Sequence, residues 1–211
     1  MKALPFARTL VLGAHTDDEM GCSGTIARLL ESGAEVYYAT FSTCEESVPE
    51  GFPKDILAHE VRKATNVLGL IEDHVIVSNY RVRHFPSVRQ EILEDLIRLR
   101  ARIKPELVIL PALSDIHQDH HVIASEGLRA FKHASVLGYE LPMNTIDFRH
   151  ACFVELKPEH LQKKLDSSLC YESQTYRSYM RDEFIRSLAK VRGVQAGVDY
   201  AEAFEVLRLI L

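Results

Sequence analysis

The 211-residue sequence lacks long apolar runs, closely paired cysteines and an excess of basic residues. No apolar stretch approaches the ~20 residues that a membrane-spanning helix requires. The segment Met1–Arg8, which precedes the first apolar run, is too short and too interrupted for a signal peptide. We therefore expect neither a membrane span nor a secretion signal.

Only four cysteines are present, and they are far apart: Cys22, Cys44, Cys152 and Cys170. They form neither the Cys-x-x-Cys pairs of structural zinc sites nor the dense set of a secreted disulfide scaffold. Reduced thiols and a cytoplasmic location are the expectation.

Basic residues do not outnumber acidic ones: 25 Lys and Arg stand against 30 Asp and Glu, for a net charge of −5. This balance argues against a nucleic acid partner, because phosphate binders present an excess of basic side chains. The chain has 46% hydrophobic residues and no repeat or linker, so we expect a single domain, 1–211. The apolar ending Phe204–Leu211 fits either a core or a subunit interface, which leaves an oligomer open.

Apolar runs typical of strands buried on both sheet faces alternate with helical patterns up to about residue 135. The expected strands are Thr9–Gly13, Val36–Phe41, His74–Val77 and Leu107–Leu110. The expected helices are Gly24–Glu31, Ile56–Leu68 and Val88–Ile103. This series predicts an α/β fold with a Rossmann-like, doubly wound, mostly parallel sheet of order about 3-2-1-4-5 and helices on both faces.

A C-terminal extension of the same domain follows, with weaker alternation. Its expected elements are an apolar segment at Val136–Leu141, a strand at Ala151–Leu156, and helices near Glu159–Leu169 and Tyr179–Arg192.

Two polar clusters follow the first and fourth expected strands. The clusters are His15-Thr16-Asp17-Asp18-Glu19 and the segment Asp115–His121, which contains His117, Asp119, His120 and His121. In a doubly wound sheet the ligand site lies beyond the carboxyl ends of the strands, where the strand order reverses. In the order 3-2-1-4 that reversal lies between the first and fourth strands, so we expect the clusters to meet.

These residue types suit a catalytic zinc ion, which takes three protein ligands and leaves a fourth position for water. His15 and Asp18 can supply two ligands, and one of the histidines of the second cluster can supply the third. Spacing alone does not choose among His117, His120 and His121. If Asp17-Asp18 stood alone, the pair would be typical of a helix N-cap.

The same residue types suit amide hydrolysis. Zinc lowers the pKa of its water toward ~7, and Asp17 could serve as the general base. A histidine held as imidazolium by a carboxylate could protonate the leaving amine, and Asp119 and Asp115 are both close in sequence to His117.

At these residues the sequence resembles the PIG-L/LmbE-like family of zinc-dependent N-deacetylases. The resemblance is carried by Ala14-His15-Thr16-Asp17-Asp18-Glu19 and His117-Gln118-Asp119-His120. It implies one zinc ion per chain held by His15, Asp18 and His120. It further implies that Asp17 is the general base, that His117 assists at the oxyanion or leaving nitrogen, and that the substrate is an N-acetyl amino sugar such as an N-acetylglucosamine conjugate. Thr16 stands where proline is usual.

A basic and aromatic loop follows the third expected strand and contains Arg81 and Arg83. Arginine suits bidentate binding of phosphate or carboxylate, so we expect Arg81 and Arg83 as candidate substrate contacts. Only one of the two need face inward, because residues of an extended segment alternate in direction. The resemblance adds Asn144 and Gln174 as substrate contacts.

Two alternatives stay open at this point. Asp119-His120-His121 also spells the motif of manganese-dependent Asp-His-His phosphoesterases. A metal-containing protein that binds a sugar or nucleotide without turnover is the second alternative.

Overall fold

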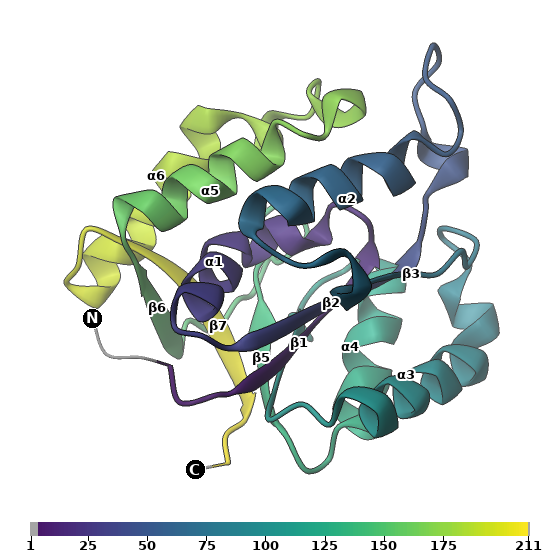
Figure 1. Ribbon diagram of the computed structural model, residues 1–211, viewed down its shortest axis with the longest axis horizontal. Helices are drawn as coiled ribbons and strands as arrows, with labels where there is room; N and C mark the ends of the chain where they lie inside the picture. The colour runs from purple at the N-terminus through teal and green to yellow at the C-terminus, as the bar shows by residue number, and fades with distance from the viewer. Residues whose placement is uncertain (1–3, 211) are drawn as a thin grey trace.

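The computed structural model describes residues 4–210 and contains one seven-stranded sheet of order β3-β2-β1-β4-β5-β7-β6 (Figure 1). The strands are β1 (Arg8–His15), β2 (Glu35–Ser42), β3 (Val75–Val77), β4 (Leu107–Pro111), β5 (Ser135–Tyr139), β6 (Cys152–Leu156) and β7 (Tyr200–Arg208). The α-helices are α1 (Ser23–Glu31), α2 (Ile56–Leu68), α3 (Arg89–Ile103), α4 (Gln118–Ala130), α5 (Pro158–Ser168) and α6 (Asp182–Ala196). The predicted α/β fold and the strand order 3-2-1-4-5 are confirmed.

The five strands β3, β2, β1, β4 and β5 are parallel. Because successive side chains of a strand point to opposite faces, β1 contributes Leu10 and Leu12 to one core and Val11 to the other. The first core lies against α3 and α4, and the second lies against α1 and α2, which in turn contact α5. Figure 1 shows these two helical layers on opposite sides of the sheet, with α6 beside α5.

The main difference from the sequence-based expectation is strand β7. The sequence predicted no strand there and left the apolar segment Phe204–Leu211 open between a core and a subunit interface. Strand β7 runs antiparallel to both β5 and β6 and lies between them. Ala201, Ala203 and Phe204 of this strand are buried. Strand β7 therefore places Phe204 in the core, whereas Val206, Leu209 and Ile210 are exposed. Leu211 lies outside the described residues. The buried Glu202 of β7 interrupts the apolar pattern, which hid the strand.

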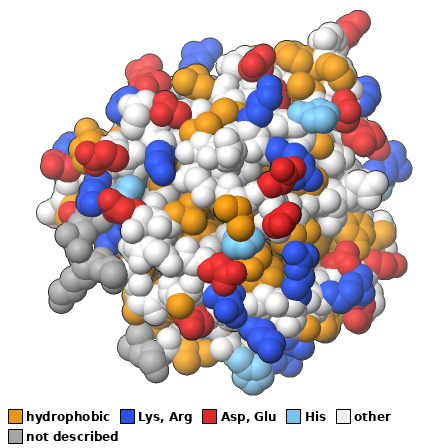
Figure 2. All heavy atoms as spheres, in the orientation of Figure 1, with side chains coloured by type: hydrophobic (Ala, Val, Ile, Leu, Met, Phe, Trp, Pro, Cys, Tyr) orange, Lys and Arg blue, Asp and Glu red, His pale blue; other side chains and the backbone are white. Residues whose placement is uncertain are grey.

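No helix within residues 4–210 is both long enough and apolar enough to cross a bilayer. Acidic and basic side chains are intermixed over the face drawn in Figure 2, as the small net charge leads one to expect. All four cysteines are free thiols.

Candidate active site and metal centre

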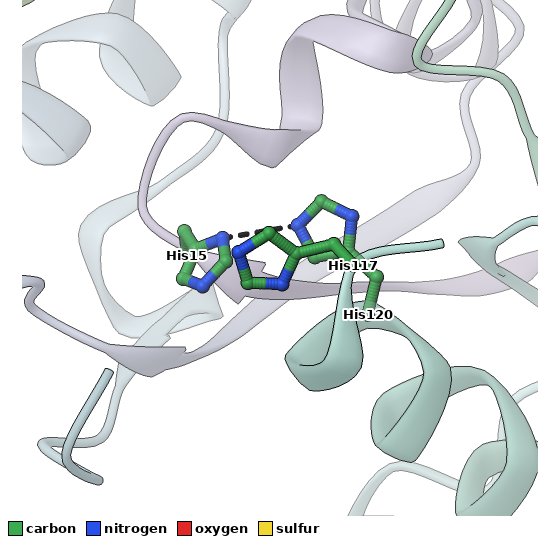
Figure 3. Close-up of side chains that lie close together, drawn as sticks. All are labelled: His15, His117 and His120. Atoms are coloured by element: carbon green, nitrogen blue, oxygen red, sulfur yellow. Dashed lines mark hydrogen bonds between the residues drawn. The ribbon is translucent and has the colours of Figure 1, made fainter. Parts of the chain in front are cut away.

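The two polar clusters meet where the strand order reverses. Strands β1 and β4 pair directly, with Thr9 opposite Leu107 and Val11 opposite Ile109. His15 is the last residue of β1, and α4 begins shortly after β4 with His117 as its N-cap. Figure 3 shows the rings of His15, His117 and His120 converging from the end of β1 and the start of α4.

Three donor atoms from the clusters form a compact triangle. Nδ1 of His15 lies 3.0 Å from Nε2 of His120 (dashed in Figure 3), and Oδ1 of Asp18 lies 3.6 Å from the first atom and 3.3 Å from the second. Tetrahedral zinc with ligands at ~2.0–2.1 Å sets its donor atoms roughly 3.3 Å apart. The triangle fits one zinc ion with a fourth position free.

The second ring nitrogen of each of these two histidines contacts a carboxylate. Nε2 of His15 lies 3.1 Å from Oδ2 of Asp119, and Nδ1 of His120 lies 2.7 Å from Oδ2 of Asp115. All four side chains are buried. Carboxylates behind metal-binding histidines fix the tautomer and the ring orientation, so both rings are held with the inner nitrogen turned toward the position of a metal ion.

Asp18 does not act as a helix cap. The 3-10 helix η1 (Asp18–Gly21) begins without a side-chain cap from Asp17. The Asp18 carboxylate instead accepts a hydrogen bond from the backbone N–H of His15 at 2.8 Å through Oδ2 and turns Oδ1 toward the two rings. Burial alone would raise the pKa of Asp18, but His120 and His15 outweigh it and hold the pKa well below its usual range. The local geometry favours a ligand role over the N-cap role.

His117 lies beside the triangle rather than on it. Its ring centroid is 4.8 Å from that of His15 and 4.5 Å from that of His120, and donor atoms of the three histidines lie within 4.8 Å of one another. Nδ1 of His117 accepts the backbone N–H of Asp119 at 3.2 Å. Burial, together with the neighbouring His120 and His15, lowers the pKa of His117 to about 4.

The ring of His117 is therefore not held by a carboxylate, as expected from the sequence, but by a backbone N–H group. The Asp119 carboxylate contacts His15, and the Asp115 carboxylate accepts the backbone N–H of His117 rather than a ring proton. At the start of α4, the backbone N–H of Asp119 faces the ring of His117, and the carboxylate of Asp119 does not. His121 faces away, with its nearest partner at Ser125 on the surface of α4.

A cavity of about 200 Å³ opens over these groups. Asp17 is partly exposed and lines it. Burial and the neighbouring Asp18 raise the pKa of the Asp17 carboxyl. The polar lining consists of His15, Asp17, Asp18, Ser47, Arg83, His117, His120, Asn144, Gln174 and Arg177. The apolar lining includes Met20, Leu57, Val82, Leu141, Met143 and Tyr179.

The structure places some of the predicted substrate contacts in the cavity and one outside it. Arg83 and Asn144 line the cavity, but Arg81 does not, and its guanidinium donates to Glu46 at 2.6 Å on the outer rim. Whether Arg81 contacts substrate stays a prediction, since it lies on the rim beside the cavity and not in its lining. Arg83 has a left-handed φ of 70°, and its backbone N–H donates to Oδ2 of Asp119 at 2.5 Å, which turns the chain there.

Sequence reasoning missed Arg177 and Tyr179 as cavity residues. Both lie near the 3-10 helix Ser178–Met180 (η6), in the connection between α5 and α6. This connection has no strand or helix periodicity, so the only sequence signal was its nearness to Gln174. Cys44 also lines the cavity, where burial and the charge of Asp17 raise the pKa of its thiol. It is a neutral wall residue.

The fold and the site together define a class of protein: a doubly wound α/β enzyme with a His/Asp centre at the crossover point of the sheet. Comparison with known proteins narrows the class. The family model for PIG-L, described as GlcNAc-PI de-N-acetylase, matches residues 10–131, more than half of the chain. The chain belongs to the PIG-L family and is a hydrolase of the N-deacetylase type.

Individual relatives agree with this assignment. An uncharacterized deacetylase, YaiS, from Escherichia coli (strain K12) is 30% identical over 162 residues, covering 74% of this chain and 85% of the relative. N,N'-diacetylchitobiose deacetylase from Pyrococcus horikoshii superposes with a TM-score of 0.79 at 20% identity, over 96% of this chain and 84% of that one.

The same fold also carries another activity. GalB, a 4-carboxy-2-hydroxymuconate hydratase from Pseudomonas putida KT2440, superposes with a TM-score of 0.79 at 20% identity, over 97% of each chain. Fold alone does not define the reaction, so the residues of the site must carry the functional argument.

Proposed function

We propose that this protein removes the N-acetyl group from a small N-acetylated amino sugar or sugar conjugate, with one zinc ion held by His15, Asp18 and His120. The observation that carries the proposal is the triangle of their donor atoms, with edges of 3.0, 3.3 and 3.6 Å. These edges match tetrahedral zinc. The carboxylates of Asp119 and Asp115 stand behind the two imidazoles as outer partners.

When bound, the zinc ion supplies a Lewis acid that activates water and polarises the amide carbonyl. Side chains of the protein accept and donate the protons of the reaction. Asp17 lines the cavity next to Asp18, where its carboxylate takes the proton of the attacking water. The Asp18 carboxylate would be bound to the metal ion and would not be available to accept a proton. The neighbouring carboxylate of Asp17 is not a ligand and is therefore the suitable base.

His117 acts as a hydrogen-bond donor to the reacting amide. Its Nδ1 accepts the Asp119 N–H, so the neutral ring carries its proton on Nε2. That N–H can donate a hydrogen bond to the oxygen of the tetrahedral intermediate or to the departing nitrogen. The proton that Asp17 takes from the water passes to that nitrogen, so the sugar leaves as an amine. The backbone hydrogen bond keeps the ring in this tautomer.

The substrate class follows from the family and from the cavity. The family description names GlcNAc-PI, and the structural relative from P. horikoshii acts on diacetylchitobiose. A cavity of about 200 Å³ with arginine, amide and apolar walls suits a polar sugar with an acetyl methyl group. The free cysteines are consistent with a cytoplasmic location. The location itself stays a prediction.

The decisive experiment measures acetate release by the zinc-loaded protein from a panel of N-acetyl sugars, sugar phosphates and nucleotide sugars. We expect turnover, reduced about 10²–10⁴-fold in Asp17→Asn with zinc content retained. Asp55→Asn, which changes an exposed aspartate ahead of α2, is the matched control.

Other outcomes would contradict the proposal. Two tightly bound manganese ions per chain with phosphoester hydrolysis would favour the Asp-His-His phosphoesterase alternative. Binding of the whole panel without acetate release would favour a binding protein, and full turnover in Asp17→Asn would exclude Asp17 as the base.

A further inference from the structure

Arg177 presents an unneutralised guanidinium to the active-site cavity. Its Nε donates to Oε1 of Gln174 at 2.6 Å. Among residues 4–210 this is its one hydrogen bond, and no carboxylate forms an ion pair with it. Its terminal nitrogens, which carry four N–H donors, are thus available to a ligand in the cavity.

The guanidinium is held in place by a chain of hydrogen bonds that ends in the core. Nε2 of Gln174 donates to Oγ of Ser173 at 3.1 Å. The backbone N–H and the hydroxyl of Ser173 donate to the two carboxylate oxygens of Glu60, at 2.9 and 2.6 Å. Glu60 lies on α2 and is buried. Arg177 is therefore pre-organised through a relay of three side chains.

Aromatic rings flank the same guanidinium. Its central carbon lies 5.2 Å from the ring centroid of Tyr176 and 5.7 Å from that of Tyr179, which lines the cavity. Rings at this distance favour a cation without neutralising it. Arg177 and Asp17, the proposed base, line the same cavity.

The other cavity arginine differs in this respect. The guanidinium of Arg83 lies 3.8 Å from Glu46, which also pairs with Arg81. Arg177 is the cavity arginine whose charge is not shared with a carboxylate. A pre-organised guanidinium favours a phosphate or carboxylate, because its planar N–H groups match two oxygens at once and little side-chain freedom is lost on binding.

We propose that Arg177 is a specificity-determining residue that binds an anionic group, a phosphate or a carboxylate, carried by the N-acetylated substrate. The proposal rests on the proposed deacetylase function and extends it by naming the charge of the substrate. Arg177 separates anionic from neutral amino sugars, while the zinc ligands and Asp17 act on the amide.

The test compares kcat and KM for three substrates: N-acetylglucosamine, its 6-phosphate and N-acetylmuramic acid. The wild-type protein prefers at least one anionic substrate, and whether this is the phosphate or the carboxylate identifies the group. In Arg177→Gln, the KM of the preferred substrate rises about ten- to hundredfold, while kcat/KM for N-acetylglucosamine changes much less. Arg177→Lys, which keeps the charge but loses the planar fork, falls in between.

The control variant is Arg186→Gln. Arg186 is exposed on α6 and pairs with Asp182 at 2.8 Å, so the same change of charge away from the cavity leaves all three substrates unaffected. If Arg177→Gln weakens neutral and anionic substrates equally, Arg177 is only a structural brace and the proposal is overturned. Equal wild-type kcat/KM for all three substrates overturns it too, although deacetylation would stand.

A binding measurement separates failure of this inference from failure of the proposed function. If no substrate releases acetate, calorimetry with glucosamine 6-phosphate and with glucosamine still tests Arg177 without turnover. Tighter binding of the phosphate, lost in Arg177→Gln, supports the inference. Equal binding of the two compounds overturns it.

Discussion

The carboxylate of Asp119 joins His15 to the loop between β3 and α3. Oδ2 lies 3.1 Å from Nε2 of His15, and the same carboxylate accepts the backbone N–H groups of Arg83 and Phe85, at 2.5 and 3.2 Å. One buried side chain thus orients a proposed zinc ligand and shapes the loop that carries Arg83 into the cavity. The proposed metal site and the proposed substrate contact Arg83 therefore share this residue.

Replacing Asp119 by asparagine keeps the shape of the side chain but removes its charge. We expect Asp119→Asn to weaken zinc binding or activity about 10–100-fold, as is typical of outer partners of metal-binding histidines. Competition with a chelating dye measures the zinc affinity. Asp166→Asn is the control, since Asp166 is exposed on α5 and bonded to Gln162. Unchanged affinity and activity in Asp119→Asn would remove Asp119 from the site.

The zinc content of single-histidine variants tests the ligand set. We expect His120→Ala to lose bound zinc, because Nε2 of His120 is a corner of the donor triangle. We expect His117→Ala to retain about one zinc ion per chain and to lose activity, since its ring lies beside that triangle. Elemental analysis after gel filtration gives both numbers. Equal loss of zinc in the two variants would make His117 a ligand.

Zinc binding is expected to release protons near neutral pH. In the metal-free protein, burial lowers the pKa values of His15 and His120, but Asp18 and the bonds to Asp119 and Asp115 outweigh burial and raise them to about 9 and about 10. The facing nitrogens of the two rings lie 3.0 Å apart and can share only one proton, and zinc binds at neutral pH only after that proton is lost. The apparent zinc affinity should fall as the pH is lowered from about 9.

Calorimetry in buffers of different ionisation enthalpy measures this release, which we expect to be about one proton per zinc ion. His121→Ala, which changes a histidine on the outer surface of α4, should leave the proton count unchanged. A count near zero at neutral pH would show that the two rings are already neutral before zinc binds.

The stability of the fold depends on Glu202 of β7. Its carboxylate accepts the backbone N–H groups of Gly24 and Thr25, at 3.0 and 2.7 Å, and pairs with Lys164 at 2.6 Å. We expect Glu202→Ala to lower the free energy of unfolding by about 3–5 kcal/mol, because it leaves a buried lysine without its partner. Urea denaturation measures the change.

Two comparisons make this prediction specific. The double variant Lys164→Met with Glu202→Leu should lose much less stability than Glu202→Ala, since no buried charge is left alone. Asp199→Ala, which removes an exposed partner of Lys190, should cost at most about 1 kcal/mol. A double variant as unstable as Glu202→Ala would point to the contacts with α1, rather than the unpaired lysine, as the cause.

Most of the fold was predictable because the strands near the N-terminus are continuous apolar runs. Strands such as Val36–Phe41 are buried on both faces, and the helices between them have a clear apolar side, so pattern and structure agree. Strand β7 was not predictable in this way. Its Glu202 and Glu205 are buried through bonds to distant segments, and local sequence does not show that such partners exist.

The active site divides in the same manner. The sequence by itself determined the types of the candidate ligands and the meeting of the two clusters, because both clusters follow parallel strands that end at the same edge of the sheet. Only the tertiary structure set the distances that distinguish His120 from His117 and His121. It also placed Arg81 outside the cavity and Arg83 and Arg177 in its lining. The physical reason is that spacing along the chain controls direction within one turn or strand, whereas distances between remote segments depend on how the whole core packs.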